Sequence, residues 1–337
     1  MAFVYNKASG LNDARFGKIE TPIRMIIEHE SDLLKEKGGP ADWLFNVETS
    51  DRFGETIVGG NEFGIFRATA EGGRAENDAP QDTFKKFIEH IQFMKSFTIT
   101  AEMMEDANYG VPVDGKLRAQ NFTRAYYKTR HHIATHVLAE AAAKKSSTSF
   151  AGTTIDITGP NQEVLFSASH KVGVEGDVQS NIFGKSGGLA DKDAIADTLA
   201  DASVEFRNMK DENGDALGYT ADTIILPGNV ATLEKNIKEV LGTEQASGNG
   251  SYINTQYGNW NLVVLPNWQV ADPDNFKKIM IMSKDASESL RGNMFFNRIP
   301  LTIDSGKDPY TSNYFWVGRC RFGVGFGSYK HIMLIEG

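Results

Sequence analysis

The sequence predicts an α+β fold that combines an extended hairpin, one very long helix and a compact α/β unit. Helical spacing runs without a glycine or proline from Lys116 to Lys145, which is far longer than an ordinary helix. Glycines punctuate short β-rich pieces between residues 49 and 80. Strand-like and helix-like segments then alternate between residues 190 and 300, as they do in α/β units.

Composition excludes several classes of protein. The chain has 337 residues, of which 40% are hydrophobic, so two or three packed units with a buried core are expected. A net charge of -9 argues against a surface that binds nucleic acid all over. The single cysteine, Cys320, excludes intrachain disulfides and is typical of a reducing compartment. Because no apolar stretch reaches membrane-spanning length and the start lacks a signal-peptide core, we expect no membrane span and no secretion signal.

The first element expected is a short helix over residues 22–37. Thr21 is a suitable N-cap, Pro22 suits a first turn, and Gly38 begins a Gly-Gly-Pro stop. The apolar residues of this helix, among them Ile26, predict one side that needs a packing partner.

A glycine-rich, two-stranded extension is expected next. Short β-rich pieces such as "ETIVGG" and "FGIFRATA" form its outgoing limb. The return limb begins near residue 82. Its Phe93, Phe97 and Ile99 alternate as in a strand, whereas Phe84 and Phe87 with their neighbours fit a helical turn equally well, so the type of this limb stays open.

The longest element is a helix over about residues 115–145. Its apolar residues repeat at intervals of four and seven, and about 30 residues at 1.5 Å each give a rod of roughly 45 Å. Seven basic residues on it face one acidic residue, Glu140, which gives a local charge of +6. They would either contact phosphates without sequence specificity or pair with acidic residues of neighbouring segments or subunits. The basic residues are Lys116, Arg118, Arg124, Lys128, Arg130, Lys144 and Lys145.

The α/β unit is predicted from alternating patterns. Residues 189–209 and 229–242 have helical spacing, and the apolar runs at 219–228 and 260–268 are typical of buried strands. The chain closes on "NYFWVGRCRFGVGFGSYKHIMLI", which predicts one or two strands. Its glycines do not form a phosphate loop, because only ten residues follow Gly327 and no helix can start there. They are expected instead to allow close backbone approach.

Two histidine motifs are candidate sites. His132 and His136 lie four apart on one helical face, but glutamate is absent from the "HHIATH" string, so packing is favoured over a metal. The string "LFSASHKVG" brings Ser167, Ser169 and His170 together in sequence, yet no GxSxG elbow accompanies them, so hydrolase chemistry is not favoured.

The order of the parts, together with four local strings, resembles the Hong Kong 97 capsid fold of tailed-phage major capsid proteins, in its Mu-like major head subunit branch. The strings are "LFSASHKVG" followed by Asn181, "TADTIILPGN", "GNWNLVVLPNW" and the closing "NYFWVGRCRFGVGFGSYKHI". The resemblance implies five parts. These are an N-terminal arm over 1–48, an E-loop over 49–97, a peripheral domain with the spine helix over 98–189, an axial domain over 190–310, and strands returning to the peripheral domain over 311–337.

The resemblance implies a structural protein rather than an enzyme, one that needs no cofactor or metal. Many copies would assemble as hexamers and pentamers into an icosahedral shell around non-specifically bound double-stranded DNA. A virion protein assembled in the host bacterial cytoplasm is implied, with a portal, a scaffolding protein and optionally a decoration protein as further partners. Some relatives carry their own scaffolding domain. Since residues before 115 are already used by the arm and E-loop, we expect a separate scaffolding protein or a chain already lacking that domain.

Two sets of site residues follow. The basic side of the long helix would line the shell interior, and apolar residues of the arm and E-loop would contact neighbouring subunits, because one subunit cannot bury them. The DNA-facing candidates are Lys116, Arg118, Arg124, Lys128 and Arg130. The intersubunit candidates are Ile26, Phe63, Ile65, Phe66, Phe84 and Phe87.

Three alternatives stay open at this point. An encapsulin-like nanocompartment would share the fold and enclose a protein cargo. A soluble α/β enzyme would have its site near His170, although the long glycine-rich segment speaks against a compact enzyme. A tail tube or sheath protein would form helical assemblies instead of closed ones.

Overall fold

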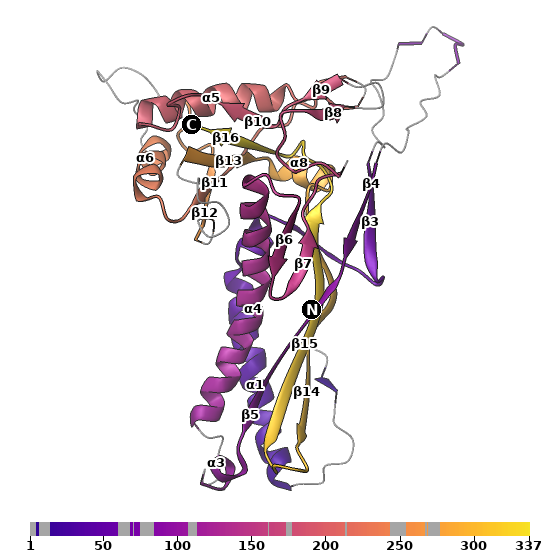
Figure 1. Cartoon of the computed structure of the whole chain (residues 1–337), viewed down its shortest axis with the longest axis vertical. Helices are drawn as coiled ribbons and strands as arrows, with labels where there is room; N and C mark the ends of the chain where they lie inside the picture. Colours follow the sequence, from indigo (N-terminus) through magenta and orange to yellow (C-terminus); the bar gives the residue numbers. More distant parts are fainter. Residues whose placement is uncertain are drawn as a thin grey trace.

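Figure 1 shows an elongated molecule in which a long rod carries a wider head. The fold is taken from a computed structural model of the chain. It describes residues 5–6, 14–59, 68–69, 71–74, 84–106, 113–160, 162–172, 177–212, 214–242, 254–266, 268 and 277–337.

The rod consists of two helices packed on a long sheet. Helices α1 (Ala14–Lys37) and α4 (Val113–Ala142) run along the sheet, whose strands have the order β1-β14-β15-β5, with β2 also pairing with β14. The pairs β14–β15 and β15–β5 are antiparallel, whereas β1 and β2 run parallel to β14. The strands are β1 (Tyr5–Asn6), β2 (Asn46–Thr49), β5 (Ile91–Ile99), β14 (Asn293–Lys307) and β15 (Tyr314–Phe326).

Alternation along β15 explains how the rod holds its helices. Tyr314, Trp316 and Phe322 are buried, and two of them, Tyr314 and Trp316, pack with Ile23 and Ile27 of α1. The intervening Arg319 is exposed on the opposite face. One face of the sheet therefore forms the core of the rod, as expected for a strand with period two.

The predicted long helix is confirmed, and the first helix is longer than predicted. Helix α4 spans 30 residues, and Ile133 and Val137 on its apolar side are almost fully buried. Helix α1 starts at Ala14, so Pro22 lies inside it instead of at its first turn. A proline costs a helix one hydrogen bond, and the packing of the α1 apolar side against α4 outweighs that local preference.

The head is built on a second sheet with strand order β10-β16-β13-β11-β12. Helices α5 (Lys192–Arg207) and α6 (Ala231–Gly242) lie on one side of it, and the upper end of α4 lies on the other. Neighbouring residues on a strand therefore point into different cores, as Ile224 and Ile225 do. The strands are β10 (Ile182–Gly184), β11 (Thr223–Pro227), β12 (Asn261–Leu265), β13 (Lys278–Met282) and β16 (Ile332–Glu336).

The remaining elements are short. The open question about the return limb of the extension is settled in favour of strands, since β4 pairs with β3 and β5 joins the rod. The two strands of the closing segment separate, because β15 belongs to the rod and β16 to the head. The short elements are β3 (Gly54–Gly59), β4 (Phe84–Glu89), β6 (Ser147–Phe150), β7 (Thr153–Asp156), β8 (His170–Val172), β9 (Asp177–Gln179), α2 (Pro40–Trp43), α3 (Ala101–Asp106) and α8 (Lys284–Ser289).

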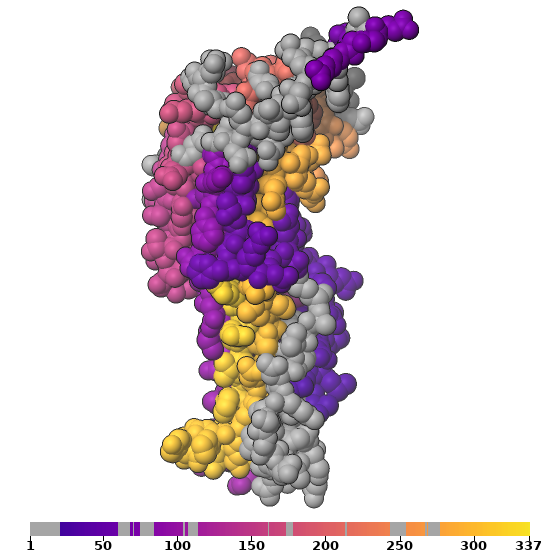
Figure 2. Space-filling view, turned by 90° about the vertical axis from the view of Figure 1, so that its right-hand side faces the viewer, coloured from indigo at the N-terminus to yellow at the C-terminus, as the bar shows by residue number. Residues whose placement is uncertain are grey.

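Figure 2 shows the molecule from the side, where C-terminal segments, in yellow, form part of the visible surface of the lower rod. The turn between β14 and β15 carries Tyr310, whose side chain is 96% exposed. Asp308 holds this turn by accepting hydrogen bonds from the Tyr310 backbone and the Thr311 hydroxyl.

Candidate assembly surfaces

The glycine run near the C-terminus holds the β3–β4 hairpin. A Cβ atom added to Gly325 would lie 2.7 Å from Cδ1 of Ile88, and one added to Gly323 would lie 2.8 Å from the carbonyl oxygen of Glu89. Ile88 and Ile57 are buried on the inner face of the hairpin. The predicted close backbone approach is thus confirmed, and the run is defined here as the glycine seat (Gly323, Gly325 and Gly327).

The outer face of the hairpin base carries an aromatic pair, defined as Phe53 and Phe87. Phe53 is 62% exposed and Phe87 50% exposed, and their rings stack with centroids 6.4 Å apart. The Arg321 guanidinium lies 5.1 Å from the Phe53 centroid. Gly54 leaves the space that the Phe87 ring fills, because an added Cβ there would lie 2.3 Å from that ring. The pair is therefore held rigidly with its apolar faces partly in water.

The six residues predicted to contact neighbouring subunits do not share one environment. Ile26 is half-buried and packs on the rod core, and Phe84 is half-buried over Gly59. Phe87 is the most exposed of the described members. The other three, Phe63, Ile65 and Phe66, lie outside the described residues. Phe53 and Arg321 were not among the predicted residues, because they adjoin Phe87 only in the fold.

Four of the five basic residues predicted to face DNA are exposed along α4. They are Lys116, Arg118, Arg124 and Lys128. Arg118 also donates a hydrogen bond to the carbonyl oxygen of Thr98 on β5. Lys116 and Arg118 lie in the first two turns of α4, and Lys128 lies near its middle.

Two of the five basic residues, the exposed Arg124 and the half-buried Arg130, pair with carboxylates of the same chain. Arg124 donates from Nε to Oε1 of Glu30 at 2.6 Å, and the Glu30 side chain is only 9% exposed. Arg130 donates to Oδ1 of Asp42 at 2.5 Å, with its own side chain 12% exposed. For these two residues the structure favours ion pairing with neighbouring segments, which was the second interpretation of the basic helix.

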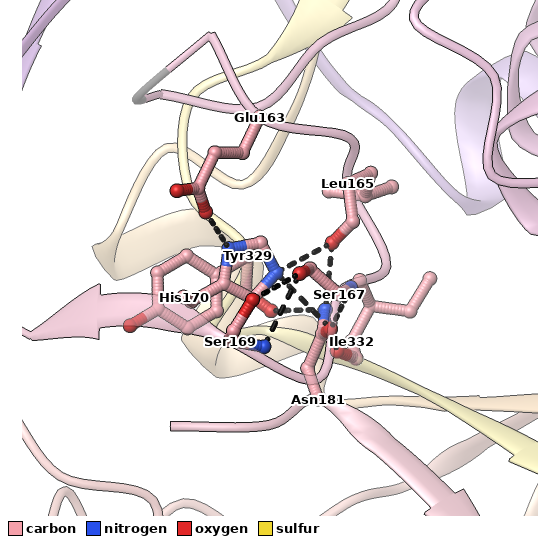
Figure 3. Close-up of polar contacts among 8 residues, drawn as sticks. All are labelled: Glu163, Leu165, Ser167, Ser169, His170, Asn181, Tyr329 and Ile332. Carbon is pink, nitrogen blue, oxygen red and sulfur yellow. Dashed lines mark hydrogen bonds and ion pairs between the residues drawn. The ribbon is translucent and has the colours of Figure 1, made fainter. Parts of the chain in front are cut away.

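His170 lies in a buried polar junction between the rod and the head (Figure 3). Its ring stacks on Tyr329 with centroids 3.8 Å apart. Nε2 lies 3.1 Å from the carbonyl oxygen of Leu165 and 3.2 Å from Oδ1 of Asn181, and Nδ1 lies 3.3 Å from Oε2 of Glu163. Burial lowers the pKa of His170, although the Leu165 hydrogen bond and the charge of Glu163 oppose that shift.

The neighbouring serines do not form a nucleophile with this histidine. The Ser169 backbone donates to the Ser167 hydroxyl at 3.2 Å, and the Ser167 backbone donates to Asn181 Oδ1 at 3.0 Å (Figure 3). Asn181 also donates to the Leu165 carbonyl at 2.8 Å and is fully buried. With both imidazole nitrogens directed at other groups, the cluster has the geometry of a structural junction and not of an activated serine.

The histidine pair (His132 and His136) and Cys320 also lie in packed surroundings and not in a reactive site. His136 Nε2 lies 2.8 Å from the Thr148 hydroxyl, and the His132 ring contacts Phe150. Within the described ranges, no group of three or more His, Cys, Asp or Glu side chains is placed to hold a metal ion. Burial raises the pKa of the Cys320 thiol to about 12, so this sulfur is poorly reactive. In the same part of the chain, no helix is both long and apolar enough to span a membrane.

Solved structures with little sequence identity are similar to this chain. A phage-related protein from Bordetella bronchiseptica RB50 is 12% identical, with a TM-score of 0.53 over 92% of this chain and 95% of its own. The capsid of the cyanophage P-SCSP1u is 11% identical, with a TM-score of 0.49 over 87% of this chain and 86% of its own. The capsid of an empty GTA particle is 14% identical, with a TM-score of 0.49 over 88% and 89%. No curated protein sequence matches the chain.

The long spine helix, the hairpin beside it and the α/β head define a capsid subunit of the Hong Kong 97 type, which is a structural protein. The sequence profile of the phage capsid protein family matches residues 88–333, and the chain belongs to that family. The resemblance stated from the sequence is thereby confirmed at the level of the family and fold. The Mu-like branch stays a prediction.

Proposed function

We propose that this chain is the shell-forming subunit of a phage head, which associates with many copies of itself as hexamers and pentamers in a closed icosahedral shell. The aromatic pair carries the proposal. Two stacked rings, each at least half exposed and fixed on a rigid hairpin base, are typical of a surface that awaits a partner. In a shell made of identical subunits, that partner is a second copy of the chain.

The five-part division is kept as part of this proposal. The arm over 1–48 and the E-loop over 49–97 would reach neighbouring subunits. The peripheral domain over 98–189, the axial domain over 190–310 and the return segment over 311–337 would form the wall of the shell. A portal, a separate scaffolding protein and a decoration protein are proposed as further partners, with assembly in the cytoplasm of the host bacterium.

Packaged double-stranded DNA is the proposed content of the shell. Its contacts would be made without sequence specificity by three exposed basic residues of α4, namely Lys116, Arg118 and Lys128. Arg124 and Arg130 are assigned a smaller part, because each already pairs with a carboxylate of the same chain.

Two double variants test these surfaces against each other. Phe53→Ser with Phe87→Ser is expected to lower the yield of closed shells at least tenfold while the unassembled subunit stays folded and loses only a few degrees in melting temperature, since half or more of each side chain lies in water. Lys116→Glu with Lys128→Glu is expected to leave shell yield unchanged and to lower the DNA content per particle. Electron microscopy counts the shells, and the ratio of absorbance at 260 and 280 nm reports DNA. Normal shell yield from the serine variant would contradict the proposed contact.

A further inference from the structure

A lysine stands on the apolar inner face of the β3–β4 hairpin. Lys86 lies directly across from Ile57 in the strand pairing and two residues before Ile88, and both isoleucines pack on the glycine seat. Lys86 itself is only 3% exposed. A buried ammonium group is costly unless a carboxylate and hydrogen-bond acceptors meet it, so this position requires a specific partner.

The partner is Asp156, 70 residues further along the chain. Nζ of Lys86 donates to Oδ2 of Asp156 and to the Thr158 hydroxyl, each at 2.6 Å. Oδ1 of Asp156 accepts from the Thr158 backbone at 2.9 Å and from its hydroxyl at 2.6 Å. Desolvation raises the pKa of Asp156, but the hydrogen bonds from Lys86 and Thr158 outweigh it and lower the pKa overall, so the carboxylate is charged.

Asp156 belongs to the rod rather than to the hairpin. It ends β7, whose partner β6 follows the upper end of α4 (Figure 1). The Thr148 hydroxyl of β6 lies 2.8 Å from Nε2 of His136 on α4. The Lys86–Asp156 pair therefore joins the hairpin to the spine helix through β6 and β7.

The contacts that hold the hairpin differ in whether they fix its direction on the rod. Ile57 and Ile88 supply apolar attraction to the glycine seat and to Met294 and Phe296 of β14, and this attraction has no preferred direction. The ammonium has a direction, because it must meet one carboxylate oxygen and one hydroxyl. When the hairpin lies away from the rod, water hydrates the same ammonium. A hairpin that cannot reach Asp156 therefore favours a position away from the glycine seat.

We propose that Lys86 is the positioning residue of the β3–β4 hairpin: the ion pair between its buried ammonium and the exposed carboxylate of Asp156 sets where the hairpin lies on the glycine seat. The inference rests on the proposed function in one respect, namely that the hairpin then presents the aromatic pair to a second subunit at a fixed angle.

Hydrogen exchange of the purified, unassembled full chain tests the positioning role. Asp156→Ala leaves the ammonium of Lys86 buried without a counter-charge, so the amides of β4 and of Gly323–Gly327 are expected to exchange at least tenfold faster than in the parent protein. Lys86→Met keeps the length of the side chain without its charge, and exchange is expected within about twofold of the parent. Adding Lys86→Met to Asp156→Ala is expected to restore slow exchange, because an apolar pair replaces the ionic one.

Asp201→Ala is the matched control. The Asp201 side chain is 58% exposed and that of Asp156 61%, and Asp201 also pairs with a lysine at 2.7 Å, but this lysine, Lys185, is 38% exposed. Its loss is expected to leave exchange at the hairpin unchanged. Unchanged exchange in Asp156→Ala, or a double variant that stays as fast as Asp156→Ala, would overturn the positioning role.

A shell assay on the same variants separates this inference from the proposed function. If positioning matters for assembly, Asp156→Ala and the double variant both give irregular particles, because an apolar pair restores the seating of the hairpin without fixing its angle. Exchange that follows the expected pattern in variants that never form shells would uphold the positioning role of Lys86 and contradict the shell proposal.

Discussion

Replacing Gly327 by alanine is expected to lower the free energy of unfolding by about 2–3 kcal/mol. The added Cβ would lie 2.4 Å from the carbonyl oxygen of Arg291 and 2.9 Å from Cδ1 of Ile57. The carbonyl is backbone, and the adjacent carbonyl of Gly292 already accepts a hydrogen bond from the Gly327 amide at 2.8 Å, so this segment has little freedom to move away. The hairpin and the strand beneath it would have to separate.

Urea denaturation of the unassembled subunit measures this effect. Gly242→Ala is the matched control, because an added Cβ at Gly242, the last residue of α6, meets no atom within 4 Å. That control is expected to change the unfolding free energy by less than about 1 kcal/mol. A Gly327→Ala variant with the urea midpoint of the parent protein would show that the glycine seat is not as close-packed as described.

Acid is expected to destabilise the subunit well before its carboxylates titrate. His331 is fully buried, with Nε2 donating to Oδ1 of Asn293 at 2.7 Å, and burial lowers its pKa to about 3. In the unfolded chain its pKa is about 6.5, so between these values only the unfolded state takes up the proton. Stability is therefore full above about pH 6.5 and is lost as the pH falls, by up to about 1.4 kcal/mol per unit from this group alone.

His331→Gln is the variant that isolates this contribution. Glutamine carries no titrating group, so the variant is expected to lose some stability at pH 7 but to lose less than the parent protein on going to about pH 5. His90 and His170 are present in both proteins, and burial lowers the pKa of each in the same direction. Urea midpoints at the two pH values provide the comparison. Equal losses in the two proteins would contradict the role assigned to His331.

Local patterns predicted much of the fold. The helix predicted over about 115–145 is α4, and the strand predicted within residues 219–228 is β11, because apolar spacing and length are properties of a single segment. The limb from Phe84 to Ile99 was ambiguous, since its aromatic residues fit both periods. Pairing with β3 and β15 decided it, and those partners lie far away in the chain.

The candidate surfaces were less predictable for the same physical reason. Arg124 and Lys128 look alike in the sequence, yet only Arg124 meets a buried carboxylate, which α1 contributes from 94 residues away. The closeness of Arg321 to Phe53 depends on the seating of the hairpin. The burial of Lys86 could not be predicted from its neighbours in the sequence. It depends on Asp156 and the glycine seat, which lie far away in the chain.

Negative-stain electron microscopy of the purified full chain, supported by light scattering, tests the central claim most directly. The account predicts closed polyhedral shells of uniform size, formed by the protein under assembly-promoting conditions. A monodisperse monomer that persists under those conditions would contradict the shell-forming role, and open helical tubes would contradict closure.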